Sequence, residues 1–183
     1  MCIVYLADKY GISLADISTG DYFVTEVDTE RKLIDEINKF APSEIICNES
    51  FYMSGVDLSD MKNRLGIAVY SLEAWYFSDE TAENTLKDHF KVQSLEGLGL
   101  SDYACGTIAA GALLRYLYET QKNDLGNLSE IHPYSTGKYM IIDSSTRRNL
   151  ELVETLREKQ KRGSLLWVLD KTKTAMGART LRA

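Results

Sequence analysis

Five acidic side chains in the first 50 residues are the candidates for metal-assisted chemistry: Asp8, Asp16, Asp21, Glu44 and Glu49. Two-metal phosphoryl transfer requires carboxylates that hold ions about 3.5 to 4 Å apart. Asp8 and Asp21 fall in or beside predicted turns, where aspartate commonly bonds the backbone. Asp16 falls within a predicted strand, and the residues next to it in the alternation offer no second carboxylate. The sequence therefore predicts no catalytic residue, no cofactor-binding residue and no metal ligand.

The histidines and glycines give no stronger catalytic pattern. His89 and His132 are the two histidines of the chain, and neither has a neighbouring Ser or Cys that it could activate. Gly97 and Gly99 precede a predicted helix but lack the third glycine of a dinucleotide-binding loop. We therefore interpret both histidines as structural or solvent-facing residues and the two glycines as part of a turn.

Short apolar runs predict a mixed β-sheet. The first three runs are rich in β-branched and aromatic residues, and Gly-containing turns at 9–11 and 18–21 separate them, which predicts an antiparallel meander. The two later runs are long enough for one strand each and too short for a helix. The predicted strands span residues 3–7, 11–17, 22–27, 44–47 and 66–70.

Three helices are expected around this sheet. The first spans residues 28–41, is amphipathic and takes Asp28 as its N-cap. The second, over 78–90, is polar. The third spans 101–121 and is small or apolar around most of its circumference, so we expect it to be buried on more than one side. Gly111 within it would let another element approach closely.

This order of elements resembles the RNase H-like fold. In that fold an antiparallel meander of three strands is followed by a helix and a further strand. Nucleases of this fold hold metal ions with carboxylates. A metal-dependent nuclease is therefore one candidate function of this chain. A nuclease would cleave nucleic acid in the presence of magnesium, whereas a non-catalytic module would not.

The periodic pattern breaks after residue 121 and changes character. We predict a first domain over 1–125, a linker over 126–138 and a helical segment over 139–183. The helical segment has no stop signal at its end, so we expect it to be a truncated piece of a longer protein, with Met1 an added start codon.

Capping residues divide this last segment. Asp143 caps a helix predicted to reach about Lys159, and Gly163 ends its tail. Ser164 opens a short apolar turn that runs to Leu169. A further helix is predicted from 174 to 183.

Charge divides the chain unevenly. Residues 1–130 carry 10 Lys and Arg against 22 Asp and Glu, a net charge of −12. Residues 131–183 carry 11 Lys and Arg against 5 Asp and Glu, a net charge of +6. The two add up to the net charge of −6 for the whole chain. The acidic part would repel a phosphate backbone, whereas the basic part could lie near one, as in a stand-alone DNA-binding module. The cations of 157–162 would equally suit the solvated last turn of a helix.

The remaining composition is that of an ordinary globular chain. It has 183 residues, of which 44% are hydrophobic and 26% charged. Its three cysteines are widely separated, which gives no signal of a disulfide framework or a zinc site and fits a reducing, cytoplasmic setting. The apolar stretches are far shorter than the ~20 residues that cross a bilayer.

Two segments carry a more specific signal. Residues 139–152 (YMIIDSSTRRNLEL) and 163–182 (GSLLWVLDKTKTAMGARTLR) closely resemble the start of the core domain of the MutS family of DNA mismatch-repair proteins. Residues 90–121, with LGLSDYACGTIAAGA at 98–112, resemble the connector domain of that family, which has an RNase H-like fold without a nuclease site. The core-domain motif residues, which we interpret as structural, are Asp143, Arg147, Arg148, Asn149, Asp170, Thr172, Thr174 and Gly177.

The resemblance implies a non-catalytic module that relays conformational signals. In the family, the connector joins the mismatch-reading domain to the core, and the core joins the DNA clamp to the ATPase. No Walker A loop is present here, so ATP and Mg²⁺ would be bound by the ATPase domain of the parent protein and not by this chain. By position, Asn84 and Thr85 match the connector helix that contacts MutL. The implied partners are MutL, the other MutS domains, a second MutS subunit and, through the parent protein, mismatched double-stranded DNA, with no membrane.

Overall fold

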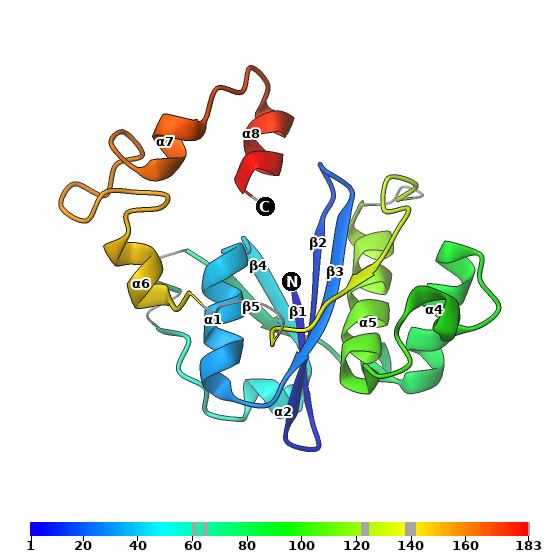
Figure 1. Ribbon diagram of the computed structural model, residues 1–183. Coiled ribbons are helices and arrows are strands. Elements are labelled where there is room, and N and C mark those ends of the chain that lie inside the picture. The colour runs from blue at the N-terminus through cyan, green and yellow to red at the C-terminus, as the bar shows by residue number, and fades with distance from the viewer. Residues whose placement is uncertain (60–61, 64–65, 122–124, 138–141, 183) are drawn as a thin grey trace.

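A single mixed β-sheet organises the first 134 residues. The computed structural model describes residues 1–59, 62–63, 66–121, 125–137 and 142–182. Within these ranges six strands pair in the order β5-β4-β1-β2-β3-β6 (Figure 1). They are β1 (Cys2–Leu6), β2 (Lys9–Asp16), β3 (Asp21–Val27), β4 (Glu44–Cys47), β5 (Ala68–Ser71) and β6 (His132–Pro133).

The predicted meander is confirmed, with one turn in a different place. β1, β2 and β3 are antiparallel neighbours, and β4 and β5 extend the sheet by parallel pairing. The first turn lies at Ala7 and Asp8, which both have positive φ, rather than at 9–11. Gly11 lies inside β2 instead. A Cβ atom there would lie 2.2 Å from the backbone carbon of Cys105, so close packing, not turn geometry, requires this glycine.

Helices flank the sheet on both faces. Their starts differ slightly from prediction: α1 is capped by Thr29, whose hydroxyl accepts a hydrogen bond from the Lys32 amide, while Asp28 pairs with the Lys32 ammonium at 2.6 Å. The helix predicted from residue 101 begins at Ala104. The helices are α1 (Glu30–Phe40), α2 (Glu49–Tyr52), α4 (Asp79–Phe90), α5 (Ala104–Gln121), α6 (Ser144–Asn149), α7 (Leu165–Leu169) and α8 (Ala175–Arg182), with 3₁₀ turns η1 (Ala74–Phe77) and η2 (Leu95–Leu98).

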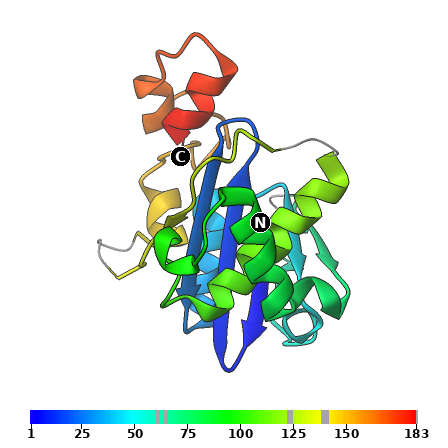
Figure 2. The same ribbon diagram turned by 90° about the vertical axis from the view of Figure 1, so that its right-hand side faces the viewer.

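Two hydrophobic cores lie on the two faces of the sheet. Strand alternation sends Ile3 and Ile45 to the face covered by α1 and α2, and sends Val4 and Ile46 to the face covered by α5. α4 packs on the far side of α5, so α5 is buried from Cys105 through Leu114, as its composition predicts. Figures 1 and 2 show this layering, with α5 between the sheet and α4.

Gly111 fixes the distance between these two helices. A Cβ atom at this position would lie 2.3 Å from the Cα atom of Ala82 in α4. The backbones of α4 and α5 therefore meet where neither side chain is larger than a methyl group. The predicted close approach to α5 is confirmed.

The segment predicted as a linker contributes to the sheet and the core. Leu128 and Ile131 are buried, and His132–Pro133 pairs in parallel with β3. Such a two-residue strand leaves no periodic pattern in the sequence, and Pro133 is tolerated because β6 lies at the sheet edge. The domain boundaries at 125 and 138 remain predictions, and residues 138–141 lie outside the described ranges.

The C-terminal segment is less regular than predicted. Asp143 caps α6, since its carboxylate accepts from the Thr146 amide at 2.7 Å, but α6 ends at Asn149 instead of near Lys159. Glu151 has positive φ, and Leu150, which would continue the helix, is 57% exposed. Without a surface to bury it, a short amphipathic helix does not extend. α7 and α8 begin as predicted, and no helix in the described part of the chain is long and apolar enough to span a membrane.

Candidate functional site

The candidate carboxylates are engaged in local structure. The residues next to Asp16 in its own strand offer no second carboxylate, as expected, but Asp21 faces it across the β2–β3 hairpin. Each is occupied by the turn: Asp16 accepts from the Ser18 amide at 2.8 Å, and Asp21 from the Thr19 hydroxyl at 2.5 Å. Partial burial would raise the pKa of Asp16, but the hydrogen bonds from Ser18 and Thr19 outweigh it and lower that pKa.

The other three carboxylates have contacts of their own, although Glu44 lines the same hollow as Asp16 and Asp21. Asp8 accepts from the Tyr5 hydroxyl at 3.0 Å in the β1–β2 turn, Glu44 accepts from the Tyr116 hydroxyl at 2.7 Å, and Glu49 begins α2. Among the residues that the structure describes, no group of three or more His, Cys, Asp or Glu side chains could hold a metal ion.

The two histidines occupy different environments. The ring of His89 lies 2.6 Å from the Tyr118 hydroxyl through Nδ1 and 2.7 Å from the Leu128 carbonyl through Nε2. It thereby ties α4 to α5 and to the segment after α5, which agrees with a structural role. His132 is part of β6, and its ring packs against Phe23.

The outer face of α4 is the candidate surface for a protein partner. Ala82 and Leu86 are buried against α5, whereas Asn84 is exposed, as the helical spacing predicts. Thr85 is half-buried, and its hydroxyl donates to the Thr81 carbonyl at 2.7 Å. Asn84 is therefore free of the core and suited to an intermolecular contact, while Thr85 lies at the border between the core and the surface.

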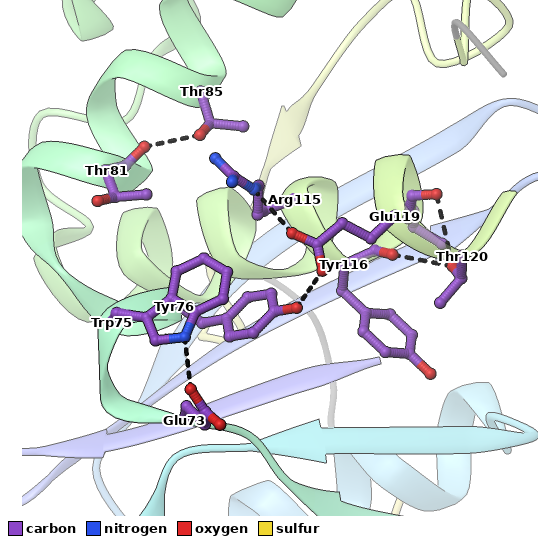
Figure 3. A network of polar contacts seen from close by, with 10 residues as sticks. Glu73, Trp75, Tyr76, Thr81, Thr85, Arg115, Tyr116, Glu119 and Thr120 are labelled. Atoms are coloured by element: carbon purple, nitrogen blue, oxygen red, sulfur yellow. Dashed lines mark hydrogen bonds and ion pairs between the residues drawn. The ribbon is translucent and has the colours of Figure 1, made fainter. Parts of the chain in front are cut away.

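A cluster that sequence reasoning missed lies beside this face. Trp75 and Tyr76 of η1 stack with ring centroids 3.9 Å apart, and the Arg115 guanidinium lies 5.3 Å from the centroid of the Trp75 ring (Figure 3). Arg115 also pairs with Glu119 at 3.0 Å. The spacing of Arg115 and Glu119 is a recognisable helical i,i+4 pair. Nothing in the sequence brings residue 75 to them.

Hydrogen bonds complete this cluster. The indole nitrogen of Trp75 donates to Glu73 at 2.8 Å, and the Tyr76 hydroxyl donates to Glu119. The bond to Glu119 raises the pKa of Tyr76 to about 12, and the same bond together with Arg115 lowers the pKa of Glu119. Tyr76 therefore stays protonated and Glu119 ionised at neutral pH, which keeps the cluster bonded.

The core-domain motif residues serve local structure. Asp170 accepts from the backbone and hydroxyl of Thr172, and Thr174 caps α8 by accepting from the Gly177 amide at 3.1 Å. A Cβ atom on Gly177 would meet Thr174 and Thr172, so this glycine fits against its own turn, not against a second helix. Arg147, Arg148 and Asn149 lie in the last turn of α6, where cations suit the helix dipole.

Opposite charges face each other between the two parts of the chain. Arg31 of α1 pairs with Asp143 at 3.6 Å. A hollow of about 1060 Å³ has both Asp16 and Asp21 and the cationic Arg147 and Arg179 in its lining. The cations of 157–162 are exposed, but they follow irregular backbone and not the predicted helix turn.

Comparison with known proteins gives matches over nearly the whole chain. The family model described as MutS domain II matches residues 1–129, and the model described as MutS domain III matches residues 145–183. A protein of Lachnoclostridium phytofermentans named DNA mismatch repair protein MutS is 63% identical over all of this chain, which covers 20% of that relative.

More distant relatives carry the same name. The protein from Ruminiclostridium cellulolyticum is 44% identical over 94% of this chain, and the one from Protochlamydia amoebophila is 38% identical over 98% of it. These alignments cover 20% and 21% of the relatives. The chain therefore spans about a fifth of the length of the curated relatives it matches.

Proposed function

Because the chain belongs to the MutS family of DNA mismatch-repair proteins, we propose that it is a connector that relays conformational signals between mismatch-DNA binding and ATP hydrolysis. Its first part would have the RNase H-like fold of the family's connector, and its second part would begin the core. It acts without catalysis of its own, in the cytoplasm. ATP and Mg²⁺ are held by the ATPase domain of the parent protein, and mismatched DNA and the second MutS subunit are contacted through that protein.

The observation that carries the relay is the anchoring of the connecting segment on the sheet. The Tyr134 hydroxyl donates to Glu36 of α1, and the Tyr134 amide donates to the Val24 carbonyl at 2.9 Å. Burial, followed by the negative charge of Glu36, raises the pKa of Tyr134, so this donor stays protonated at neutral pH. A displacement of the sheet would therefore move Tyr134, which precedes the C-terminal segment, with it.

Removing that anchor tests the relay. In a full-length MutS that contains this sequence, Tyr134→Phe should reduce the stimulation of ATP hydrolysis by mismatched DNA and leave hydrolysis without DNA unchanged. Tyr5→Phe is the matched control, because the Tyr5 hydroxyl bonds Asp8 in an exposed hairpin turn. Equal stimulation in the two variants would contradict the relay through this segment.

The outer face of α4 supports a second role, docking of MutL. Its buried side holds the helix in place, so exposed Asn84 projects from a rigid element, and Thr85 borders it. Interface positions on rigid helices cost little ordering when a partner binds.

Two substitutions on α4 test the docking surface. Asn84→Arg places a large cation on the exposed face of α4. Thr85→Glu places a larger, charged side chain at the border between the core and the surface. Both should therefore weaken association with MutL of the same organism. An exposed substitution changes the free energy of unfolding by about 0.5 kcal/mol or less, so the thermal midpoint of Asn84→Arg should stay nearly unchanged. Asn149→Arg, on exposed α6, is the matched control. Unaltered MutL binding by folded Asn84→Arg and Thr85→Glu would remove α4 from the interface.

A further inference from the structure

Trp75 combines exposure with unusually firm support. Its side chain is 44% exposed, yet it stacks on Tyr76, donates to Glu73 and lies under Arg115. Tyr76 packs in turn against the core on the α5 face of the sheet. A large aromatic side chain that is already held in one orientation loses little conformational entropy when a partner covers it.

The supporting residues are of the types that dominate protein interfaces. Trp, Tyr and Arg are enriched among the side chains whose truncation costs the most binding energy. The Trp75 and Tyr76 rings stack on each other, and the Arg115 guanidinium lies over the Trp75 ring (Figure 3). Because Glu119 neutralises Arg115 at 3.0 Å, the cluster presents the indole without an excess of positive charge.

Arg115 connects this cluster to the face of α4. A shallow hollow of about 370 Å³ between α4 and α5 is lined by six residues, among them Thr85, Asp88 and Arg115. Arg115 is therefore the shared wall between the hollow and the Trp75 ring. Through Arg115, the hollow that Thr85 lines is adjacent to Trp75 of η1.

The charge of this surface defines its partner. Residues 73–91 carry five carboxylates and two lysines, a formal charge of −3. Glu73, Asp79, Glu80 and Asp88 are exposed, and Lys87 pairs with Glu83 at 2.6 Å. An indole on a segment of net negative charge complements an apolar pocket that is bordered by Lys or Arg.

We propose that Trp75, supported by Tyr76 and Arg115, is the anchor of a protein-docking surface that spans η1, α4 and α5 and receives an apolar pocket with a basic border. The inference rests on the proposed MutL docking, and it adds the anchor and the chemistry of the partner. The partner's pocket covers the indole, while its basic border lies against Glu73 and Asp88.

Alanine substitution of the two tryptophans gives a matched test. Trp75→Ala should weaken association of the 183-residue chain with MutL at least tenfold. Trp167→Ala, which removes a side chain of similar exposure (47%) on α7, should change it less than twofold. Asp88→Lys should weaken association and reduce its salt dependence, because salt screens the attraction between the acidic face and the basic border.

A second readout leaves Trp75 intact. With both tryptophans replaced by 5-fluorotryptophan, ¹⁹F NMR of the chain should show the Trp75 resonance shifting on addition of MutL and the Trp167 resonance unmoved. If Asn84→Arg weakens MutL binding while Trp75→Ala does not and the Trp75 resonance is unmoved, the anchor is wrong and the docking face on α4 stands. If neither Asn84→Arg nor Trp75→Ala weakens MutL binding, both the Trp75 anchor and the proposed MutL docking on α4 are wrong.

Discussion

The sheet body and the C-terminal segment start their helices with the same local signals but continue them differently. Thr29, Asp143 and Ser164 each accept a hydrogen bond from an amide in the first helical turn. In the body α1 then runs for 11 residues against a buried surface, whereas α6 stops after 6. Among the described residues of 142–182, Ser164 and Leu166 are the buried ones.

The difference lies in burial, not in composition. The C-terminal segment has many large apolar side chains, but they are exposed: Ile142, Leu150, Val153, Leu156, Leu165, Trp167, Val168, Leu169, Met176 and Leu181. A cap decides where a helix can begin, and packing of an apolar face decides how far it continues. The two regions should therefore respond differently to the same kinds of change.

The largest contrast is expected from truncating matched leucines. Leu86 of α4 is fully buried and Leu150 after α6 is 57% exposed. Leu86→Ala should lower the free energy of unfolding by about 2 to 5 kcal/mol, because it leaves a cavity beside α5. Leu150→Ala should change it by about 0.5 kcal/mol or less. Chemical denaturation followed by circular dichroism measures both, and equal losses would contradict the contrast in burial.

Overpacking at glycine should give the next largest effect. Gly11→Ala places a Cβ atom 2.2 Å from the Cys105 backbone, so β2 and α5 must separate. We expect a loss of about 1 to 3 kcal/mol, or roughly 2 to 4 °C of thermal midpoint for each kcal/mol in a chain of this size. Gly97→Ala is the control, since no atom lies within 4 Å of its added Cβ. A tolerated Gly11→Ala would show that α5 is less firmly seated on β2.

Loss of the α1 cap should have a smaller effect. Thr29→Ala removes the acceptor for the Lys32 amide, and such caps contribute about 1 kcal/mol. Asp28→Ala leaves that bond in place and should cost less. If Asp28→Ala were the more destabilising of the two in thermal unfolding, the sequence-based assignment of Asp28 as the cap would be restored.

The smallest expected effect is a local pH response in the C-terminal segment. Bonds from Lys161, then from Thr172, lower the pKa of Asp170 from 3.8 to about 2. Because the folded-state pKa is the lower one, this stabilisation is complete above about pH 4 and is lost as the pH falls toward 2. Amide exchange at Thr172, measured by NMR, should therefore show less protection across that interval. Asp170→Asn should remove the change, and Glu158→Gln, an exposed carboxylate of the same segment, should keep it.

The features that depend on neighbours in sequence could be predicted. Alternation in the first 27 residues predicts three strands, and β1, β2 and β3 form there. Helical spacing in α4 correctly separates buried Leu86 from exposed Asn84. The assignment of Asn84 and Thr85 to a MutL contact came from resemblance and stays a prediction.

The features that depend on distant residues could not be predicted. Strand β6 pairs residues that are more than 100 positions apart along the chain, and two residues are too few for a pattern. Trp75 and Arg115 meet because α5 crosses the sheet beside η1. Neither contact has a local signal, so the sequence predicts neither the edge strand nor the aromatic cluster.

By itself the sequence determined the approximate positions of the three-stranded meander and of the main helices, which of their faces are apolar and to which family the chain is similar, because these depend on side-chain type and short spacing. The tertiary structure decided the length of α6, the packing role of Gly11 and the cluster around Trp75. Those features depend on whether a second surface is present to bury a side chain or to hold it in place, and that surface comes from residues far away in the chain.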